Sequence, residues 1–311
     1  MNSVNAKHVH RFIGRNYSTI PAAPGVKHAT TGKTNLLGLS LPELSDLITK
    51  STAAKPFVAK QLYTWIYKSK VYNFEQMTNL SKELRGYLTE NHGVTLAKIH
   101  KLQKSTDGTI KFLFGFSADN AGTSEKPNKI VETVYIPEEN RATLCVSSQY
   151  GCSLNCKFCH TGTQKFQGNL TPLEIVGQIL TAENYLINNT DSPLNNANKP
   201  VISNIVFMGQ GEPLMNFRNL KAAIGLLSDS GGISLSRKKI TVSTSGIIKN
   251  VEKVAADLGV RLAISLHASN DKTRSLIMPI NKVFGLEPLM ESVRNFVKLS
   301  KCDKTKRVTF E

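Results

Sequence analysis

Four of the chain's five cysteines lie within one short segment, "CVSSQYGCSLNCKFCHTGTQ". Cys152, Cys156 and Cys159 form the pattern C-x3-C-x2-C, and Cys145 lies seven residues before them. Three thiolates from one short loop can bind three corners of a cubane iron-sulfur cluster, because the loop wraps around it and each sulfur reaches a different iron. The fourth iron then stays open to another ligand.

Structural zinc is the alternative for these cysteines. A zinc site normally takes four protein ligands in two paired groups. The only additional ligand nearby is His160, which is adjacent to Cys159 and badly placed to complete a tetrahedron. The spacing therefore favours the iron-sulfur cluster over zinc.

An alternation of strands and helices must position this loop. We expect strands at "ATLCVSS", "ISNIVFMG", "KKITVSTSG", "RLAISLHA" and "RVTFE", with helices after the first four. In "TPLEIVGQIL", Thr171 is a candidate N-cap, Pro172 the first helical residue and Glu174 the capping-box partner. Repeated strand-helix units predict a parallel sheet with right-handed crossovers.

Both an open dinucleotide-binding sheet and a closed or partial barrel satisfy this alternation. The glycine fingerprint of dinucleotide binding is absent, which favours the barrel. In either fold the active site forms at the carboxyl ends of the strands. Those ends carry "SSQYGC", "GQGEP", "STSG" and "LHAS", all rich in small and hydrogen-bonding residues.

Two further regions precede the alternating segment, which we assign to residues 141–311. Residues 36–98 predict a small helical domain, in which Val58, Leu62, Trp65 and Ile66 recur at helical spacing. Residues 99–140 predict a β-rich connector, with a tight turn at Asp107-Gly108 and an exposed loop at "SADNAGTSEKPN".

The chain is basic, with 39 Lys and Arg against 23 Asp and Glu. Five of the basic residues precede the first acidic residue, Glu43, so the remainder keeps 34 basic and 23 acidic residues. This surplus favours a polyanionic partner, RNA or DNA, although a merely soluble basic protein would also show it. We expect no membrane span, because no run of about 18 apolar residues occurs. Clustered cysteines in an odd number indicate a reducing compartment.

The first 35 residues, which we exclude from the fold, are rich in Arg, Lys, Ser, Thr and Asn and contain no Asp or Glu. This composition is typical of a mitochondrial transit peptide, and "RNYS" (residues 15–18) resembles a matrix-processing site. We therefore expect a mitochondrial matrix protein. A disordered N-terminal tail on a cytoplasmic protein is the alternative.

The cysteine pattern after the first strand resembles that of the radical S-adenosylmethionine (SAM) superfamily, and "GQGEP" resembles its Gly-Glu motif. The segments "VETVYIPEENRATLCVSSQYGCSLNCKFCHTGTQ", "MGQGEPLMN", "VSTSG", "ISLHASND" and "MPINK" resemble, in order and spacing, the RlmN family of ribosomal-RNA adenine carbon-2 methyltransferases. The form "CHTGTQ" is similar to versions from bacteria related to mitochondria. The resemblance implies an α/β fold with a partial (βα)6-type radical SAM barrel, of which five of six strands are present.

The resemblance also implies roles for eleven residues. Cys152, Cys156 and Cys159 would hold a 4Fe-4S cluster. The residues that would contact SAM are Gly211, Glu212, Ser243, Ser265, Leu266 and His267. Glu132 would accept a proton and Cys145 would help to resolve a covalent protein-RNA adduct. Structural interpretations stay open for three of them: Ser243 could end a strand, His267 could be a satisfied histidine in the barrel mouth, and Glu132 could be a solvated strand residue.

The implied reaction uses two SAM molecules per turnover. One methylates a cysteine near the carboxyl terminus, and the second generates the radical that activates this methyl group for addition to adenine. A disulfide between Cys145 and the methyl-carrying cysteine then forms and must be reduced. The implied partners are ribosomal RNA and transfer RNA, together with a one-electron reductant such as a ferredoxin or flavodoxin-type protein. We expect a monomer.

One departure from the family leaves alternatives open. The sequence stops after the fifth strand, whereas the family continues through a sixth strand and the methyl-carrying cysteine. Cys302 belongs to no family motif, and we expect it to be a free surface thiol. We therefore expect a fragment of a longer product. The alternatives are a non-methylating iron-sulfur RNA-binding remnant and a Cfr-like adenine carbon-8 methyltransferase.

Overall fold

The computed structural model describes residues 33–52, 54–116, 129–189, 200–301 and 307–311. The transit-peptide-like segment, the loop at "SADNAGTSEKPN" and Cys302 lie largely or wholly outside these ranges. Among the described residues, no helix is both long and apolar enough to cross a membrane.

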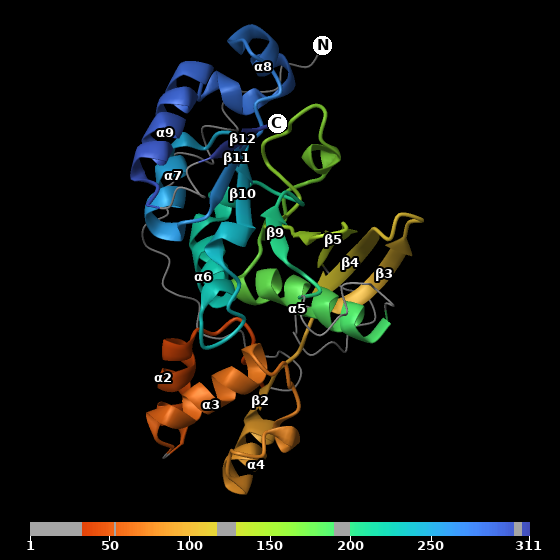
Figure 1. The fold of residues 1–311 in the computed structure, drawn as a ribbon, viewed down its shortest axis with the longest axis vertical. Coiled ribbons are helices and arrows are strands. Elements are labelled where there is room, and N and C mark those ends of the chain that lie inside the picture. Colours follow the sequence, from red (N-terminus) through yellow and green to blue (C-terminus); the bar gives the residue numbers. More distant parts are fainter. Residues whose placement is uncertain (1–32, 53, 117–128, 190–199, 302–306) are drawn as a thin grey trace.

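A small helical unit comes first along the chain and forms the lower part of Figure 1. It contains three α-helices and a short parallel pair of strands: β1 (Thr34–Asn35), α2 (Leu41–Ser51), α3 (Pro56–Tyr67), α4 (Lys82–Asn91) and β2 (His92–Gly93). Leu62 and Ile66 of the predicted apolar face are fully buried in its core. A capping box between Ser40 and Glu43 begins α2, because each residue binds the other's backbone N–H group.

The helical unit contacts the rest of the chain at defined points. The Tyr63 hydroxyl donates to Asp229 Oδ2 at 3.2 Å, and Lys70 forms an ion pair with Glu183. Gly38 has a φ of +87°, and a Cβ there would lie 2.6 Å from the Leu173 backbone. Only glycine permits both this conformation and this close approach, so the start of α2 is fixed against the second unit.

The second unit is built on one eight-stranded sheet with the order β12-β11-β10-β9-β6-β5-β4-β3. Five strands are parallel: β6 (Ala142–Cys145), β9 (Asn204–Phe207), β10 (Ile240–Thr244), β11 (Arg261–Ile264) and β12 (Val308–Phe310). They coincide with the five predicted strands, so the predicted α/β fold with a parallel sheet is confirmed. Their order runs in one direction without reversal, as in a barrel, whereas a doubly wound sheet reverses at a switch point.

Helices follow the first four parallel strands, as predicted. They are α5 (Pro172–Asn189), α6 (Phe217–Ser228), α7 (Ile248–Lys253) continued by a π-helical turn (Val254–Leu258), α8 (Asp271–Ile277) and α9 (Leu286–Leu299). Right-handed crossovers in a constant direction place such helices on one face of the sheet, as Figure 1 shows for α5, α6, α7 and α9. The predicted capping box of α5 is present, with Thr171 N–H donating to Glu174 Oε2 at 2.7 Å.

Three antiparallel strands extend this sheet: β3 (Lys98–Lys104), β4 (Ile110–Phe116) and β5 (Lys129–Pro137). β5 pairs with β6, so the β-rich connector and the parallel strands form one continuous sheet. Gly108 takes the predicted turn between β3 and β4 with a φ of +85°. Helix α5 covers one face of this extension, where Thr133 donates to Gln178 Oε1 at 2.8 Å. The β3–β4 hairpin projects away from the helices (Figure 1).

Candidate functional site

A cavity of about 210 Å³ lies at the carboxyl ends of the parallel strands. Eight of the eleven predicted site residues line it: Cys152, Cys156, Cys159, Gly211, Glu212, Ser243, Ser265 and His267. The three others, Glu132, Cys145 and Leu266, do not. The fold therefore gathers residues from four loops, which are separated by more than a hundred positions in sequence, around one space.

The cysteine loop begins where the chain turns sharply after a short strand. Gly151 has a φ of +71°, and a Cβ at this position would lie 2.4 Å from the Lys165 carbonyl oxygen. Within the loop, Cys159 N–H donates to Cys156 O at 3.1 Å, and Lys157 N–H donates to Ile277 O at 2.9 Å. These bonds fix the direction of the loop, so that its three sulfurs line the same cavity.

The donor set of this loop fits a cluster better than a single ion. Among the described residues, no three His, Cys, Asp or Glu side chains converge as the ligands of one metal ion would. His160 is exposed and does not line the cavity, so it supplies no fourth zinc ligand. Three separate thiols facing one cavity are what a cluster needs when each sulfur binds a different iron.

Two thiols of this loop, those of Cys152 and Cys156, are protonated at neutral pH when no metal is bound. Burial raises the pKa of Cys152 to about 12 and that of Cys156 to about 11. Metal binding requires thiolates and therefore releases these protons. All four described cysteines are free, so the disulfide that the resemblance implied for Cys145 is not present among them.

Glu212 is a buried carboxylate at the floor of the cavity, only 2% exposed. Its Oε1 accepts from Leu214 N–H at 3.0 Å and its Oε2 from Ser245 N–H at 2.8 Å. Burial raises its pKa, and these hydrogen bonds oppose that rise. A carboxylate held in a poorly solvated place gains energy from a cationic ligand, and the amino group of SAM is such a ligand.

Gly211 allows the chain to pass close to Gln149. Its φ is +94°, and a Cβ would lie 2.4 Å from Gln149 Cβ. Gln149 itself accepts from Glu212 N–H at 2.8 Å through its side-chain oxygen. The "GQGEP" segment is therefore locked against the strand end that precedes the cysteine loop.

The predicted serines converge on a residue that the sequence did not single out. Ser243 Oγ and Ser265 Oγ lie 3.5 Å apart, and each donates to Glu311 Oε2 at 3.4 Å. Glu311 also lines the cavity. It follows the fifth strand, so the rule that polar residues at strand ends form the site could have identified it.

His267 lies at the rim of the cavity with an unusual backbone. Its φ is +57°, which is uncommon for a residue other than glycine. Its ring is exposed and lies 4.3 Å from the ring of Phe158 in the cysteine loop, measured between centroids. It is therefore not a satisfied interior histidine. Leu266 is adjacent but contributes its backbone, since its N–H donates to Glu311 O at 3.0 Å.

Cys145 and Glu132 share the face of the sheet that α5 does not cover. Cys145 pairs with Val134, and Glu132 lies two residues before Val134 on the same side of the strand. Burial raises the pKa of Cys145 to about 11, and the charge of Glu132 adds to this rise. Glu132 is partly exposed and forms an ion pair with Lys111 at 3.0 Å, which is also what a solvated strand residue would do.

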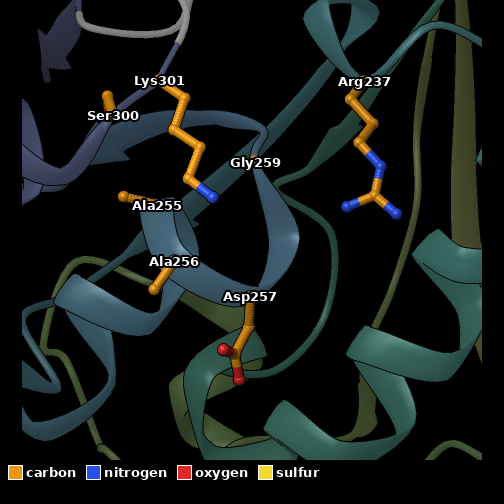
Figure 2. A pocket seen from close by; sticks show the side chains of 7 residues that line it. All are labelled: Arg237, Ala255, Ala256, Asp257, Gly259, Ser300 and Lys301. Atoms are coloured by element: carbon orange, nitrogen blue, oxygen red, sulfur yellow. The ribbon is translucent and has the colours of Figure 1, made fainter.

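A second cavity of about 240 Å³ lies at the opposite end of the parallel strands (Figure 2). Arg237, Asp257, Gly259 and Lys301 are among its lining residues, and none of the eleven predicted site residues is. Lys221 forms an ion pair with Asp257 at 3.0 Å, and Arg237 donates to Leu258 O. These interactions secure the helix-strand connections there, and no thiol or buried carboxylate is found among the described residues that line this cavity.

Comparisons with known proteins match both units of the chain. Residues 34–94 match the ribosomal RNA large subunit methyltransferase N-terminal domain, and residues 146–306 match the radical SAM superfamily. A dual-specificity RNA methyltransferase RlmN from Paracoccus denitrificans is 43% identical, over 96% of this chain and 73% of the relative. One of the same name from Sinorhizobium fredii is 44% identical, over 95% and 72%.

A solved structure gives the same result for the fold. The crystal structure of a radical SAM methyltransferase from Sphaerobacter thermophilus superimposes with a TM-score of 0.76 at 31% identity. The match covers 89% of this chain and 75% of that one.

Proposed function

Since the chain belongs to the RlmN family of radical SAM RNA methyltransferases, we propose that it methylates carbon 2 of an adenine in large-subunit ribosomal RNA and in transfer RNA. One observation carries the proposal: three cysteine thiols and the buried Glu212 face a single cavity at the carboxyl ends of the parallel strands. Carbon 2 of adenine is not nucleophilic, so polar methyl transfer fails there and one-electron chemistry is needed.

Cys152, Cys156 and Cys159 would hold the 4Fe-4S cluster in this cavity. When bound, the cluster supplies the electron that cleaves SAM, and SAM supplies the methyl carbon. Glu212 would bind the amino group of SAM, because its carboxylate is fixed by two backbone N–H groups and is otherwise poorly solvated. Gly211, Ser243, Ser265, Leu266 and His267 would complete the SAM contacts.

Cys145 and Glu132 would act on the RNA adduct. At neutral pH the Cys145 thiol is protonated, because burial raises its pKa to about 11. It becomes a nucleophile only after losing this proton. Glu132 would receive a proton from the adduct, and its ion pair with Lys111 would then have to open. The proposal also includes a transient disulfide between Cys145 and the methyl-carrying cysteine of the family.

The face of β3–β5 that α5 does not cover, called the uncovered face below, offers a surface for the RNA backbone. Glu132 pairs with Leu113, and Leu113 pairs with Lys101. Paired residues share a face, so Lys101 and Glu132 lie on the same side of the sheet. Lys98 lies on it too, through Gly115 and Ile130, and both lysines are exposed. Neighbouring strands are about 4.8 Å apart, so β3 lies about 14 Å from the strand of Cys145.

Three further features are part of the proposal. A ferredoxin or flavodoxin-type protein would reduce the cluster, and the protein would act as a monomer in the mitochondrial matrix. The composition of residues 1–42, with no acidic residue, supports import. A fluorescent protein fused to these residues should co-localise with a matrix marker, and cytoplasmic fluorescence would contradict the assignment.

Mass spectrometry of RNA from cells with and without the gene tests the function. We expect 2-methyladenosine to disappear from large-subunit ribosomal RNA, and its transfer-RNA level to fall. Unchanged levels in both RNAs would overturn the proposal. Loss of 8-methyladenosine would instead select the Cfr-like alternative. The gene with Cys156 replaced by Ser should fail to restore the modification, whereas the unaltered gene should restore it.

A further inference from the structure

Arg274 on α8 is the largest of the described side chains that the fold buries completely, with 0% exposure. Arginine is almost never buried without a charged partner. Among the described residues, however, its hydrogen bonds go to three backbone carbonyls and one side-chain amide, and it forms no ion pair. The role of this cation is therefore not explained by a salt bridge.

The three carbonyls belong to the strand ends of the SAM site. Nη2 donates to Ser245 O at 2.7 Å and to Ser265 O at 3.1 Å, and Nε donates to Leu266 O at 3.0 Å. Ser245 follows β10 and also binds Glu212, whereas Ser265 and Leu266 follow β11. One planar group thus sets the distance between two neighbouring strand ends.

The same group supports the unusual backbone at the rim. Leu266, whose carbonyl Arg274 binds, directly precedes His267 with its φ of +57°. Such conformations persist only when the surroundings determine them from several sides. Here Arg274 binds the Leu266 carbonyl oxygen. Glu311 O accepts from the N–H groups of Leu266 and His267 at 3.0 and 2.9 Å.

Arg274 is anchored from its other end by Asn281 in "MPINK". Nη1 donates to Asn281 Oδ1 at 2.7 Å, and Asn281 Nδ2 donates to Asp271 Oδ1 at 2.8 Å. The carboxylate of Asp271 is thereby linked to the guanidinium through a neutral amide. Arg274 lies on the helix whose Ile277 carbonyl accepts from Lys157 N–H of the cysteine loop at 2.9 Å, so its positive charge is carried on an element that contacts this loop.

We propose that Arg274 is a positioning residue for both cofactors. Its guanidinium fixes the ends of β10 and β11 that receive SAM, and its charge lies on the helix that contacts the loop whose thiolates bind the cluster. A buried cation next to an anionic centre favours the more negative state, so Arg274 raises the reduction potential of the cluster. This inference rests on the proposed cofactors and does not depend on which RNA is methylated.

Two substitutions in the anaerobically reconstituted protein separate the two effects. Arg274→Lys keeps the charge but cannot bind four acceptors with one planar fork. We expect the Kd for SAM, measured by calorimetry, to rise about tenfold because the ends of β10 and β11 lose their shared hydrogen-bond donor, with the midpoint potential close to wild type. Arg274→Met removes both functions, so it should weaken SAM binding at least as much and shift the midpoint potential to more negative values. The exposed Lys272 on the same helix is the matched control, and Lys272→Gln should change neither quantity.

Asn281→Ala provides an independent test of the positioning role if the arginine variants fold poorly. It removes one of the four acceptors and leaves the charge in place, so SAM binding should weaken severalfold with an unchanged potential. Folded, iron-loaded Arg274→Lys or Asn281→Ala protein with wild-type affinity for SAM would overturn the positioning role. An unchanged potential in iron-loaded Arg274→Met would overturn the electrostatic role. Failure of the wild type to load iron or bind SAM would instead contradict the proposed function.

Discussion

The parallel and antiparallel parts of the sheet differ in how they hold functional groups. At the carboxyl ends of the parallel strands, two backbone N–H donors fix Glu212, and Ser243 and Ser265 both donate to Glu311. On the uncovered face of β3–β5, Lys98 and Lys101 are exposed. Bond-breaking chemistry needs fixed geometry, whereas binding to the phosphate backbone tolerates mobile charges. In our proposal, the parallel part carries the chemistry and the antiparallel part docks the RNA.

The largest effect should come from removing a cluster ligand. Cys156→Ala leaves two thiols for the cluster, so we expect iron content and reductive SAM cleavage to fall to background. Iron analysis, visible absorbance and chromatography of the cleavage products measure this. Cys302→Ser is the matched control, because Cys302 belongs to no motif, and it should retain full iron and cleavage. A Cys156→Ala protein with wild-type cleavage would remove the cysteine loop from the chemistry.

A backbone substitution tests how rigid the parallel part is. Gly211→Ala would place a Cβ 2.4 Å from Gln149 Cβ at a φ of +94°, so we expect a loss of about 2–4 kcal/mol in the free energy of unfolding. Gly225→Ala is the control, since a Cβ there meets no atom within 4 Å and alanine favours the helix. It should be neutral or slightly stabilising in denaturant unfolding. Equal effects of the two substitutions would show that the close approach at Gly211 is unimportant.

Cys145 lies where the parallel and antiparallel parts of the sheet meet. The pH dependence of its alkylation tests whether it is buried like the parallel part or solvated like the exposed face. Because burial raises its pKa to about 11, the thiolate fraction, and with it the rate of alkylation, should rise about tenfold per pH unit from pH 7 until near that value. Peptide mass spectrometry after timed iodoacetamide treatment measures the rate. Glu132→Gln removes a nearby negative charge and should lower the pKa, so alkylation at pH 8 should accelerate. A plateau near pH 8.5 would place Cys145 in an ordinary solvated setting.

The smallest effect is expected on the exposed face. Lys98→Gln combined with Lys101→Gln should weaken RNA binding severalfold and reduce the slope of log K against log salt by up to about 2, as loss of two phosphate contacts does. Lys238→Gln with Lys239→Gln makes the same charge change just before β10, at the amino ends of the parallel strands, and should alter the slope less. Filter binding at several salt concentrations measures both. Identical slopes for the two variants would refute docking on this face.

Local signals account for what the sequence could predict. The five strands and the start of α5 were predicted because apolar periodicity and the Thr171-Glu174 capping box act within a few residues. Eight of the residues that the motifs singled out line one cavity. Arg274 and Glu311 escaped notice because their roles depend on contacts between strand ends. The common face of Cys145 and Lys101 follows from strand register, which periodicity alone does not specify.

Binding of RNA and reductive cleavage of SAM, measured side by side in two variants, test the separation of roles most directly. The account predicts that Cys156→Ala loses SAM cleavage and keeps wild-type RNA affinity. It predicts that Lys98→Gln with Lys101→Gln weakens RNA binding and keeps SAM cleavage at the wild-type rate. Loss of both activities in each variant, with the proteins folded, would contradict the division of the sheet into a chemical part and an RNA-docking part.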